Sequence, residues 1–150
     1  MALSLDKDYG NLPDILDLYE KLYSNFDKDS DMNGKTMLEI SKANPNSYAY
    51  YEERAIELKY LLDTLELRRT QIQGKLYQGL KKGSNIALNE REINQYVKSD
   101  DLYVDISIMI LEVKELHDKF LLAVTTFKNI GYSMNNLTKL MIAQLEQETL

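Results

Sequence analysis

From Leu102 to Gln147, apolar side chains recur every seven residues in two parallel series, and this periodicity limits the fold more than any other feature of the sequence. Spacings of three and four residues place such side chains along one face of an α-helix. A third series beside them, with Ile110 and Val124, is also largely apolar, so the stripe is wider than the seam of a two-stranded coiled coil. The pattern predicts one very long helix that contacts more than one neighbour. The first series contains Ile106, Val113, Phe120, Phe127 and Met134.

A second helical seam runs from Ser47 to Leu76, where seam residues follow one another by threes and fours without a slip. We expect this helix to pair antiparallel with the long one and to cover only one side of it. The uncovered side then predicts contacts with other copies of the chain, with the Ile106 series in the intermolecular core. The seam residues are Tyr48, Tyr51, Ala55, Leu58, Leu62, Leu65, Arg69, Ile72 and Leu76.

Arg69 is the one charged residue in this seam. Its alkyl stem can pack while the guanidinium reaches solvent, which is the interpretation we favour. The charge can also be placed for register, for a buried partner, or for a ligand that enters where the helices splay. Because Gly is a weak helix former and a common C-terminal stop, the cluster of Gly74, Gly79 and Gly83 predicts that the helix ends by Gly83.

Two capping signals precede the long helix. Asn89, with Glu92 three residues later, matches a capping box and predicts a short helix that begins there. Ser99-Asp100-Asp101 is a second N-cap signal, which predicts a bend or restart before the helix from about Leu102 to Gln147.

The first 46 residues are less regular. Asn11–Phe26 predicts one short amphipathic helix, with Asn11 as its cap and Pro13 in its first turn. Asp27–Gly34 is a polar loop, and Asn44-Pro45-Asn46 predicts a break before the seam helix. The predicted organisation is a variable N-terminal segment over residues 1–46, with one short helix and an acidic loop, and a helical hairpin core over 47–150.

The composition favours an all-α chain in a single domain. The 150 residues include only 2 prolines and 6 glycines, and they show no alternation of β-branched residues. Cysteine is absent, which excludes a disulfide framework and a thiolate metal site and favours a reducing cytoplasm. No apolar run approaches transmembrane length, and Met1–Gly10 has no signal-peptide pattern, so we expect a soluble protein without membrane contact.

Few residues offer catalytic chemistry. His117 is the single histidine, and it lies on an apolar heptad position, where a packed or interface histidine is expected. The stretch Gly79–Gly83 lacks the Gly-Lys-Ser/Thr that would hold a phosphate and Mg²⁺. We therefore expect no catalytic residues, no cofactor and no enzymatic activity.

One stretch resembles the start of a calcium-binding EF-hand loop. Asp29, Asp31, Asn33 and Gly34 supply oxygen ligands at alternate positions and a Gly at the sharp turn. The bidentate Glu would fall six residues after the Gly, where the chain has Ile40. A solvated acidic loop is the favoured interpretation, a cation site is the alternative, and we expect no metal.

Charge is segregated along the chain. Between Leu67 and Asn89 there are five basic residues and no Asp or Glu, so this window carries +5 in a chain of net charge −6, and the remainder sums to −11. A cationic strip on an anionic body attracts a polyanion locally and repels it elsewhere, so nucleic acid is the expected partner. The alternative is that the cations only solvate a helix end. The five residues are Arg68, Arg69, Lys75, Lys81 and Lys82.

The order of these parts resembles the UvsY family of tailed-phage recombination mediators over roughly residues 47–144. The basic patch Lys75-Leu-Tyr-Gln-Gly-Leu-Lys-Lys-Gly83 carries the resemblance together with three C-terminal stretches. Family members have a variable N-terminal part, a helix that ends in a basic Leu/Tyr/Gly patch, a loop and a long C-terminal helix. The C-terminal stretches are Glu92–Asp100, Tyr103–Asp105 and Phe127–Asn136.

The resemblance implies a ring-like homo-oligomer that binds single-stranded DNA in the cytoplasm of an infected bacterial host. It also implies that the protein helps to load a RecA-like recombinase onto DNA covered by single-strand-binding protein. The DNA contacts fall on Lys75, Tyr77 and Lys81, with Lys82 and Arg69 as neighbours on the strip. The family pattern also places a positive charge near Gly131, which this chain lacks.

Two function classes follow. The favoured one is a non-enzymatic, single-stranded-DNA-binding recombination mediator. The alternative is a structural or regulatory helical oligomer, such as a phage assembly factor or a host-defence inhibitor, that does not bind DNA. The acid-free window favours the first class, because an assembly protein does not need such segregation of charge.

Overall fold

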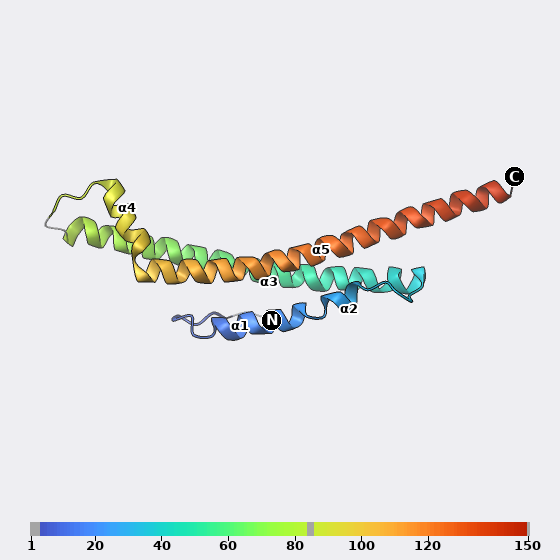
Figure 1. Cartoon of the computed structure of the whole chain (residues 1–150), viewed down its shortest axis with the longest axis horizontal. Helices are drawn as coiled ribbons and strands as arrows, with labels where there is room; N and C mark the ends of the chain where they lie inside the picture. The colour runs from blue at the N-terminus through green and yellow to red at the C-terminus, as the bar shows by residue number, and fades with distance from the viewer. Residues whose placement is uncertain (1–3, 84–85, 150) are drawn as a thin grey trace.

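A computed structural model describes residues 4–83 and 86–149, and within these ranges the chain is helical without any strand. The two long helices α3 and α5 lie side by side as an antiparallel hairpin, α1 and α2 lie along one side of it, and α4 lies at its closed end (Figure 1). The predicted all-α fold is confirmed. The helices are α1 (Leu12–Tyr23), α2 (Phe26–Ser30), α3 (Met37–Gly83), α4 (Glu90–Ser99) and α5 (Asp101–Glu148).

The core is the seam between α3 and α5. Tyr51, Leu58 and Leu65 of α3 are fully buried, as are Val113 and Phe120 of α5. The predicted seam thus holds over its middle, where burial of a large apolar side chain stabilises the fold by about 1.5–3 kcal/mol. It loosens toward the end of α3, where Ile72 and Leu76 are only half-buried.

Aromatic rings from α1 and α2 close the other side of this core. Tyr19 and Tyr23 of α1 contact Phe120 edge-on, with ring centroids 5.9 and 5.5 Å apart. Phe26, the first residue of α2, contacts Phe127 with centroids 5.9 Å apart. Edge-to-face pairs of this kind add about 0.5–1.5 kcal/mol each to their area burial.

This enclosure corrects the intermolecular role that the sequence suggested for the Ile106 series. Ile106, Val113, Phe120 and Phe127 are 0–1% exposed within a single chain, so they are covered by its own helices. Met134 is partly buried and packs against the same core. The sequence pattern did not reveal this because the short N-terminal helices, which supply the missing cover, lie far away in the sequence.

Two tyrosine hydroxyls tie the outer helices to α3. Tyr19 of α1 donates to Glu57, whose carboxylate also accepts from Arg54 at 3.0 Å. Tyr51 of α3 donates to Asp29 of α2 at 3.0 Å. Burial and the adjacent carboxylate raise the pKa of both tyrosines, so both hydroxyls stay protonated donors at neutral pH.

The helix ends follow the predicted signals. Helix α3 ends at Gly83. At α4, the Asn89 side chain accepts from the Glu92 backbone N–H and the Glu92 carboxylate accepts from the Asn89 N–H, both at 2.9 Å, which is the expected capping box. Asp100 caps α5 by accepting from the Leu102 N–H. These predictions are confirmed because the capping interactions are local to the sequence.

Asn11 is at the N-cap position of α1, as predicted, but its side chain does not cap the helix. Its amide donates to the Ser4 carbonyl at 2.7 Å, and its oxygen accepts from the Asp6 N–H at 2.9 Å. Asn11 therefore fixes the N-terminal segment against the start of α1. The predicted single helix over 11–26 is also divided, because α1 ends at Tyr23 and α2 begins at Phe26.

The predicted break at Asn44-Pro45-Asn46 is wrong, since α3 continues through Pro45. A proline within a helix costs about 3 kcal/mol or more, because it removes one backbone hydrogen bond and crowds the preceding turn. Here the flanking residues are held by α5. The Asn44 amide donates to the Phe127 carbonyl at 3.0 Å, and Ile40 and Tyr48 pack against the core.

Gly131 lies where α3 and α5 approach closely. A Cβ at this position would lie 3.3 Å from the amide nitrogen of Asn44, which is tighter than normal packing. A side chain at position 131 would crowd the Asn44 amide that bonds to Phe127.

The C-terminal end of α5 extends beyond the start of α3 (Figure 1). From Asn135 to Thr149 every side chain is exposed. We call residues 135–149 the projecting end. Several large apolar side chains of the projecting end are exposed to solvent, and a cluster of this kind is typical of an interaction surface. These are Leu137, Leu140, Met141, Ile142 and Leu145.

Replacing Phe120 by Ala should lower the free energy of unfolding by about 3–5 kcal/mol, because the cavity would open among rings of α1 and α3. Urea denaturation followed by circular dichroism measures this. Leu122→Ala is the matched control, since Leu122 is 61% exposed on the same helix, and it should change stability by about 0.5 kcal/mol or less. The difference should not depend on protein concentration. If Phe120→Ala lowers the free energy of unfolding only at concentrations where the chain self-associates, Phe120 would instead belong to a contact between copies.

Candidate nucleic-acid interface

Three lysines of the acid-free window lie exposed on the last turns of α3. Lys75 and Lys82 are seven residues apart and lie on one side of the helix, and Lys81 lies about a quarter turn away. None of the three forms an ion pair with a carboxylate in the part of the chain that the structure describes. We call these three residues the lysine end of α3.

Tyr77 lies within the lysine end. Its ring is half-buried, and the Lys81 ammonium lies 5.9 Å from the ring centroid. The ring therefore keeps a partly exposed surface beside a cation. Proteins that bind single-stranded nucleic acids commonly combine an aromatic face, on which a base stacks, with a positive charge that contacts a phosphate.

The two arginines of the window make contacts within the chain instead. The Arg68 guanidinium lies 5.0 Å from the Tyr9 ring centroid and donates to the Asp6 carbonyl at 3.3 Å, so Arg68 holds the N-terminal segment. Arg69 is half-buried and lies 5.9 Å from the ring centroid of Tyr103 on α5. Of the interpretations left open for Arg69, the structure supports a partner within the fold, because the guanidinium lies near the Tyr103 ring.

Helix α4 brings two more cations to the same end of the hairpin. Its Ile93 and Val97 are buried, and it packs against α3 and α5 (Figure 1). Arg91 and Lys98 lie on its exposed outer side, next to Glu90. Sequence reasoning missed these cations because they follow the acid-free window and alternate with acids. The spacing of Ile93 and Val97 on one side of α4 could have indicated that this helix packs against the hairpin and presents Arg91 and Lys98 to solvent.

The loop between α3 and α4 is described only from Ile86 onward, so residues 84 and 85 of the window lie outside the described residues. The structure thus divides the predicted strip. It leaves Lys75, Lys81 and Lys82 accessible beside Tyr77, while Arg68 and Arg69 are engaged elsewhere.

His117 lies far along α5 from the lysine end, and its side chain is 12% exposed. Its Nδ1 lies 3.3 Å from Asp118, which also pairs with Lys114 at 3.1 Å. The Lys114 hydrogen bond is the main cause that lowers the pKa of the Asp118 carboxyl. The low exposure of its side chain matches the expected packed histidine.

The calcium-like stretch is already internally bonded. Asp29 is within α2 and accepts from Tyr51, and Asp31 accepts from the Asn33 backbone N–H at 2.9 Å. Over residues 4–83 and 86–149, no group of three or more His, Cys, Asp or Glu side chains is arranged to hold a metal ion. In the same ranges no helix has both the length and the apolar character needed to cross a bilayer.

Comparison of the chain with protein-family models, with curated proteins and with solved structures found no match.

The division of the strip predicts different stability effects. Replacing Lys75, Lys81 and Lys82 together by Ala should change the free energy of unfolding by about 0.5 kcal/mol or less, because all three are exposed and the contact of Lys81 with the Tyr77 ring lies at an exposed position. Arg69→Ala should lower it by about 1 kcal/mol through loss of the packed stem and the contact with Tyr103. Urea denaturation measures both. A lysine triple variant as destabilised as Arg69→Ala would show that the lysines serve the fold.

Proposed function

We propose that this protein is a non-enzymatic, homo-oligomeric protein that binds single-stranded DNA through the lysine end of α3 and acts as a recombination mediator. The observation that carries this proposal is the separation of the cations. Lys75, Lys81 and Lys82 lie together, exposed and without acidic partners among the described residues, on a chain whose remaining charge is strongly negative.

Phosphate contact is the chemistry that such a site supports. Each lysine carries its charge on a flexible side chain. Such a side chain suits contacts with the phosphates of a flexible single strand better than recognition of the hydrogen-bonding edge of a particular base. Tyr77 adds an aromatic face on which a base of any identity can stack. The proposed mode is therefore sequence-tolerant, single-strand binding driven mainly by counterion release.

Three lysines alone hold a single strand weakly at physiological salt, so the proposal needs assembly. Several copies along one strand would act together, because each further contact becomes intramolecular. The projecting end of α5 supports this step, since its five exposed apolar residues would be covered by the same segment of other copies. This surface replaces the Ile106 series as the proposed intermolecular contact.

The mediator role, with a RecA-like recombinase and single-strand-binding protein as partners, rests on the resemblance to the UvsY family. A ring-like oligomer with DNA-binding lysines would concentrate single strand near the recombinase. The alternative, a structural or regulatory oligomer without DNA binding, needs the projecting end but not the lysine end. Variants of the lysine end and variants of the projecting end can therefore distinguish the two functions.

Titration of a fluorescent oligonucleotide at several salt concentrations tests DNA binding. Wild-type log affinity should fall linearly with log salt, with little dependence on sequence. Replacing Lys75, Lys81 and Lys82 by Ala should make the slope shallower by about 2 per chain, since each lost phosphate contact removes about 0.7 from the slope for single strands.

A matched control replaces Lys59 and Lys114, which are exposed but paired with Asp63 and Asp118 on the same helices. This variant should keep most of the wild-type affinity. If the lysine-end variant binds as tightly and with the same slope as wild type, the lysine end is only a solvated helix terminus and the alternative function is favoured.

Light scattering tests the assembly surface. The wild-type mass should be several times the 17.4 kDa of one chain. Leu140→Asp with Leu145→Asp should reduce it toward one chain while helicity is kept, because a carboxylate is disfavoured in an apolar contact but costs little on an exposed helix end. Ile56→Asp is the control, since Ile56 is 64% exposed but lies on α3 away from this end. A monomeric wild type at micromolar concentration would remove the oligomer.

A further inference from the structure

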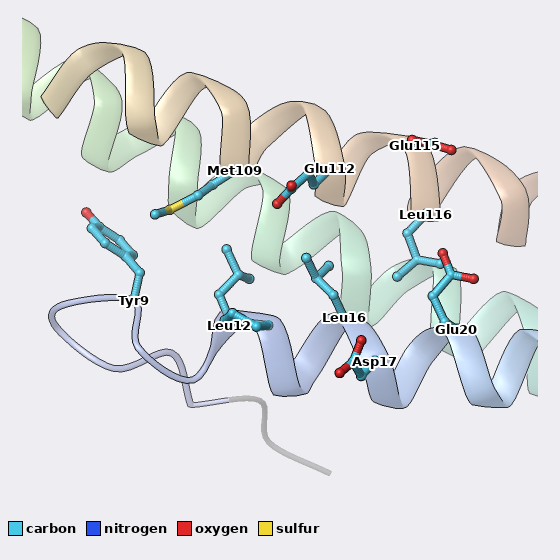
Figure 2. Close-up of a pocket in the computed structure, with 10 residues that line it drawn as sticks. Tyr9, Leu12, Leu16, Asp17, Glu20, Met109, Glu112, Glu115 and Leu116 are labelled. Carbon is cyan, nitrogen blue, oxygen red and sulfur yellow. The ribbon is translucent and has the colours of Figure 1, made fainter. Parts of the chain in front are cut away.

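A groove lies between α1 and α5, with a volume of about 420 Å³ (Figure 2). Its walls are mostly apolar, with Leu12 and Leu16 on α1 facing Met109 and Leu116 on α5. Leu12 and Leu116 are buried, whereas Leu16 and Met109 are only half-buried. The groove therefore presents apolar surface that the chain does not cover itself.

Carboxylates line both edges of the groove, with Asp17 and Glu20 on α1 and Glu112 and Glu115 on α5. Lys119 forms ion pairs with two of these carboxylates, since its ammonium lies 3.2 Å from Glu20 and 3.9 Å from Glu115. Asp17 and Glu112 form no ion pair within the described part of the chain. An apolar floor with two unpaired carboxylates suits a segment that presents apolar and cationic side chains together.

The end of α3 has this composition. Lys81 and Lys82 are exposed there, and Leu76 and Leu80 are half-buried beside them. The chain as a whole carries a net charge of −6, so two copies repel each other except where such opposite patches meet. Charge complementarity thus favours an orientation in which the end of α3 of one copy meets the groove of the other.

The lysine end cannot reach the groove of its own chain. Arg68 touches Tyr9, which lies at one end of the groove. Lys81 lies thirteen residues farther along the same unbroken helix, which is about 20 Å at 1.5 Å per residue. Only a second copy can bring these lysines to Asp17 and Glu112.

We infer that the groove between α1 and α5 binds the end of α3, from Leu76 to Lys82, of a second copy of this chain. Leu76 and Leu80 cover the apolar floor, and Lys81 and Lys82 pair with Glu112 and Asp17. The two contacting surfaces differ, so the interface is head-to-tail: in a pair, one copy keeps a free lysine end and the other keeps a free groove.

Single-stranded DNA would compete for the same lysines, a consequence that rests on the proposed function. The groove then acts as an acidic substitute for the phosphate backbone in the absence of DNA. Binding of a polyanion would release the head-to-tail contact, because Lys81 and Lys82 cannot pair with both.

Carbodiimide cross-linking of an isotopically mixed sample tests the contact on the wild-type chain. This reagent joins a lysine to a carboxylate only when the two are paired, and equal amounts of ¹⁴N- and ¹⁵N-labelled protein distinguish links between copies from links within one. We expect mixed-isotope peptides that join Lys81 or Lys82 to Asp17 or Glu112, with a yield that falls at high salt. Their absence, while Lys59–Asp63 is linked within one chain, would overturn the inference.

Charge reversal provides the second measurement. One variant carries Asp17→Lys and Glu112→Lys, and the other carries Lys81→Glu and Lys82→Glu. Each variant alone carries only amines or only carboxylates at positions 17, 112, 81 and 82, so it cannot form these links, and the mixture of the two variants is the informative sample. Mixing the two variants should restore links that join position 17 or 112 of the first to position 81 or 82 of the second. Links that fail to return in the mixture would overturn the inference.

A control variant with Asp63→Lys and Glu66→Lys raises the net charge by the same amount as Asp17→Lys with Glu112→Lys, on exposed positions of α3 outside the groove. It should keep the wild-type yield of links at the groove. If it loses them equally, the effect comes from net charge and the specific contact is rejected.

An arm with oligonucleotide separates this inference from the proposed function. Added single strand should reduce the mixed-isotope links at least about tenfold when the lysines are saturated. If the links form but single strand does not reduce them, the groove contact stands and DNA binding by the lysine end fails. If the lysines bind DNA but no links form without it, the proposed function stands and the groove contact fails.

Discussion

The packing of α3 against α5 is the interaction on which the other features depend. Most of the stability of a helix in a protein comes from packing of its apolar face, so α3 and α5 depend on the burial of their apolar faces against each other. Tyr51, Phe120 and Phe127 form the centre of this contact, with the Tyr51 and Phe127 rings stacked at 5.2 Å. Helices α1 and α2 cover the core only over the middle of the hairpin. The two ends of the hairpin are therefore exposed, one with lysines and the other with apolar side chains.

That difference gives each end its proposed role. At the closed end, α3 carries Lys75, Lys81 and Lys82 without acids nearby in the sequence, and α4 adds Arg91 and Lys98. At the open end, α5 continues past α3 and exposes apolar side chains. Long-range repulsion by the acidic body would direct a polyanion to the first end, while apolar burial would join copies at the second. The proposed DNA contact and the exposed apolar surface of the projecting end thus lie at opposite ends of the hairpin.

Sequence reasoning predicted the parts that depend on local signals. The caps at Asn89 and Asp100, the stop at Gly83 and the middle of the α3 seam each involve residues a few positions apart, and these were found where expected. It failed where distant segments decide. Pro45 stays helical because Asn44 bonds to α5, and Phe120 and Phe127 are enclosed by α1 and α2. Likewise, the contacts of Arg68 with Tyr9 and of Arg69 with Tyr103 depend on the tertiary fold.

Lysine footprinting of the complex with single-stranded DNA tests the central claim most directly. Reductive methylation with and without oligonucleotide, read by mass spectrometry, reports the accessibility of each lysine. We expect strong protection of Lys75, Lys81 and Lys82, whereas Lys59 and Lys114, which are exposed and paired with acids, should react equally in both states. Protection at Lys59 or Lys114 in place of the lysine end, or no protection at any lysine under conditions where the strand is bound, would contradict it.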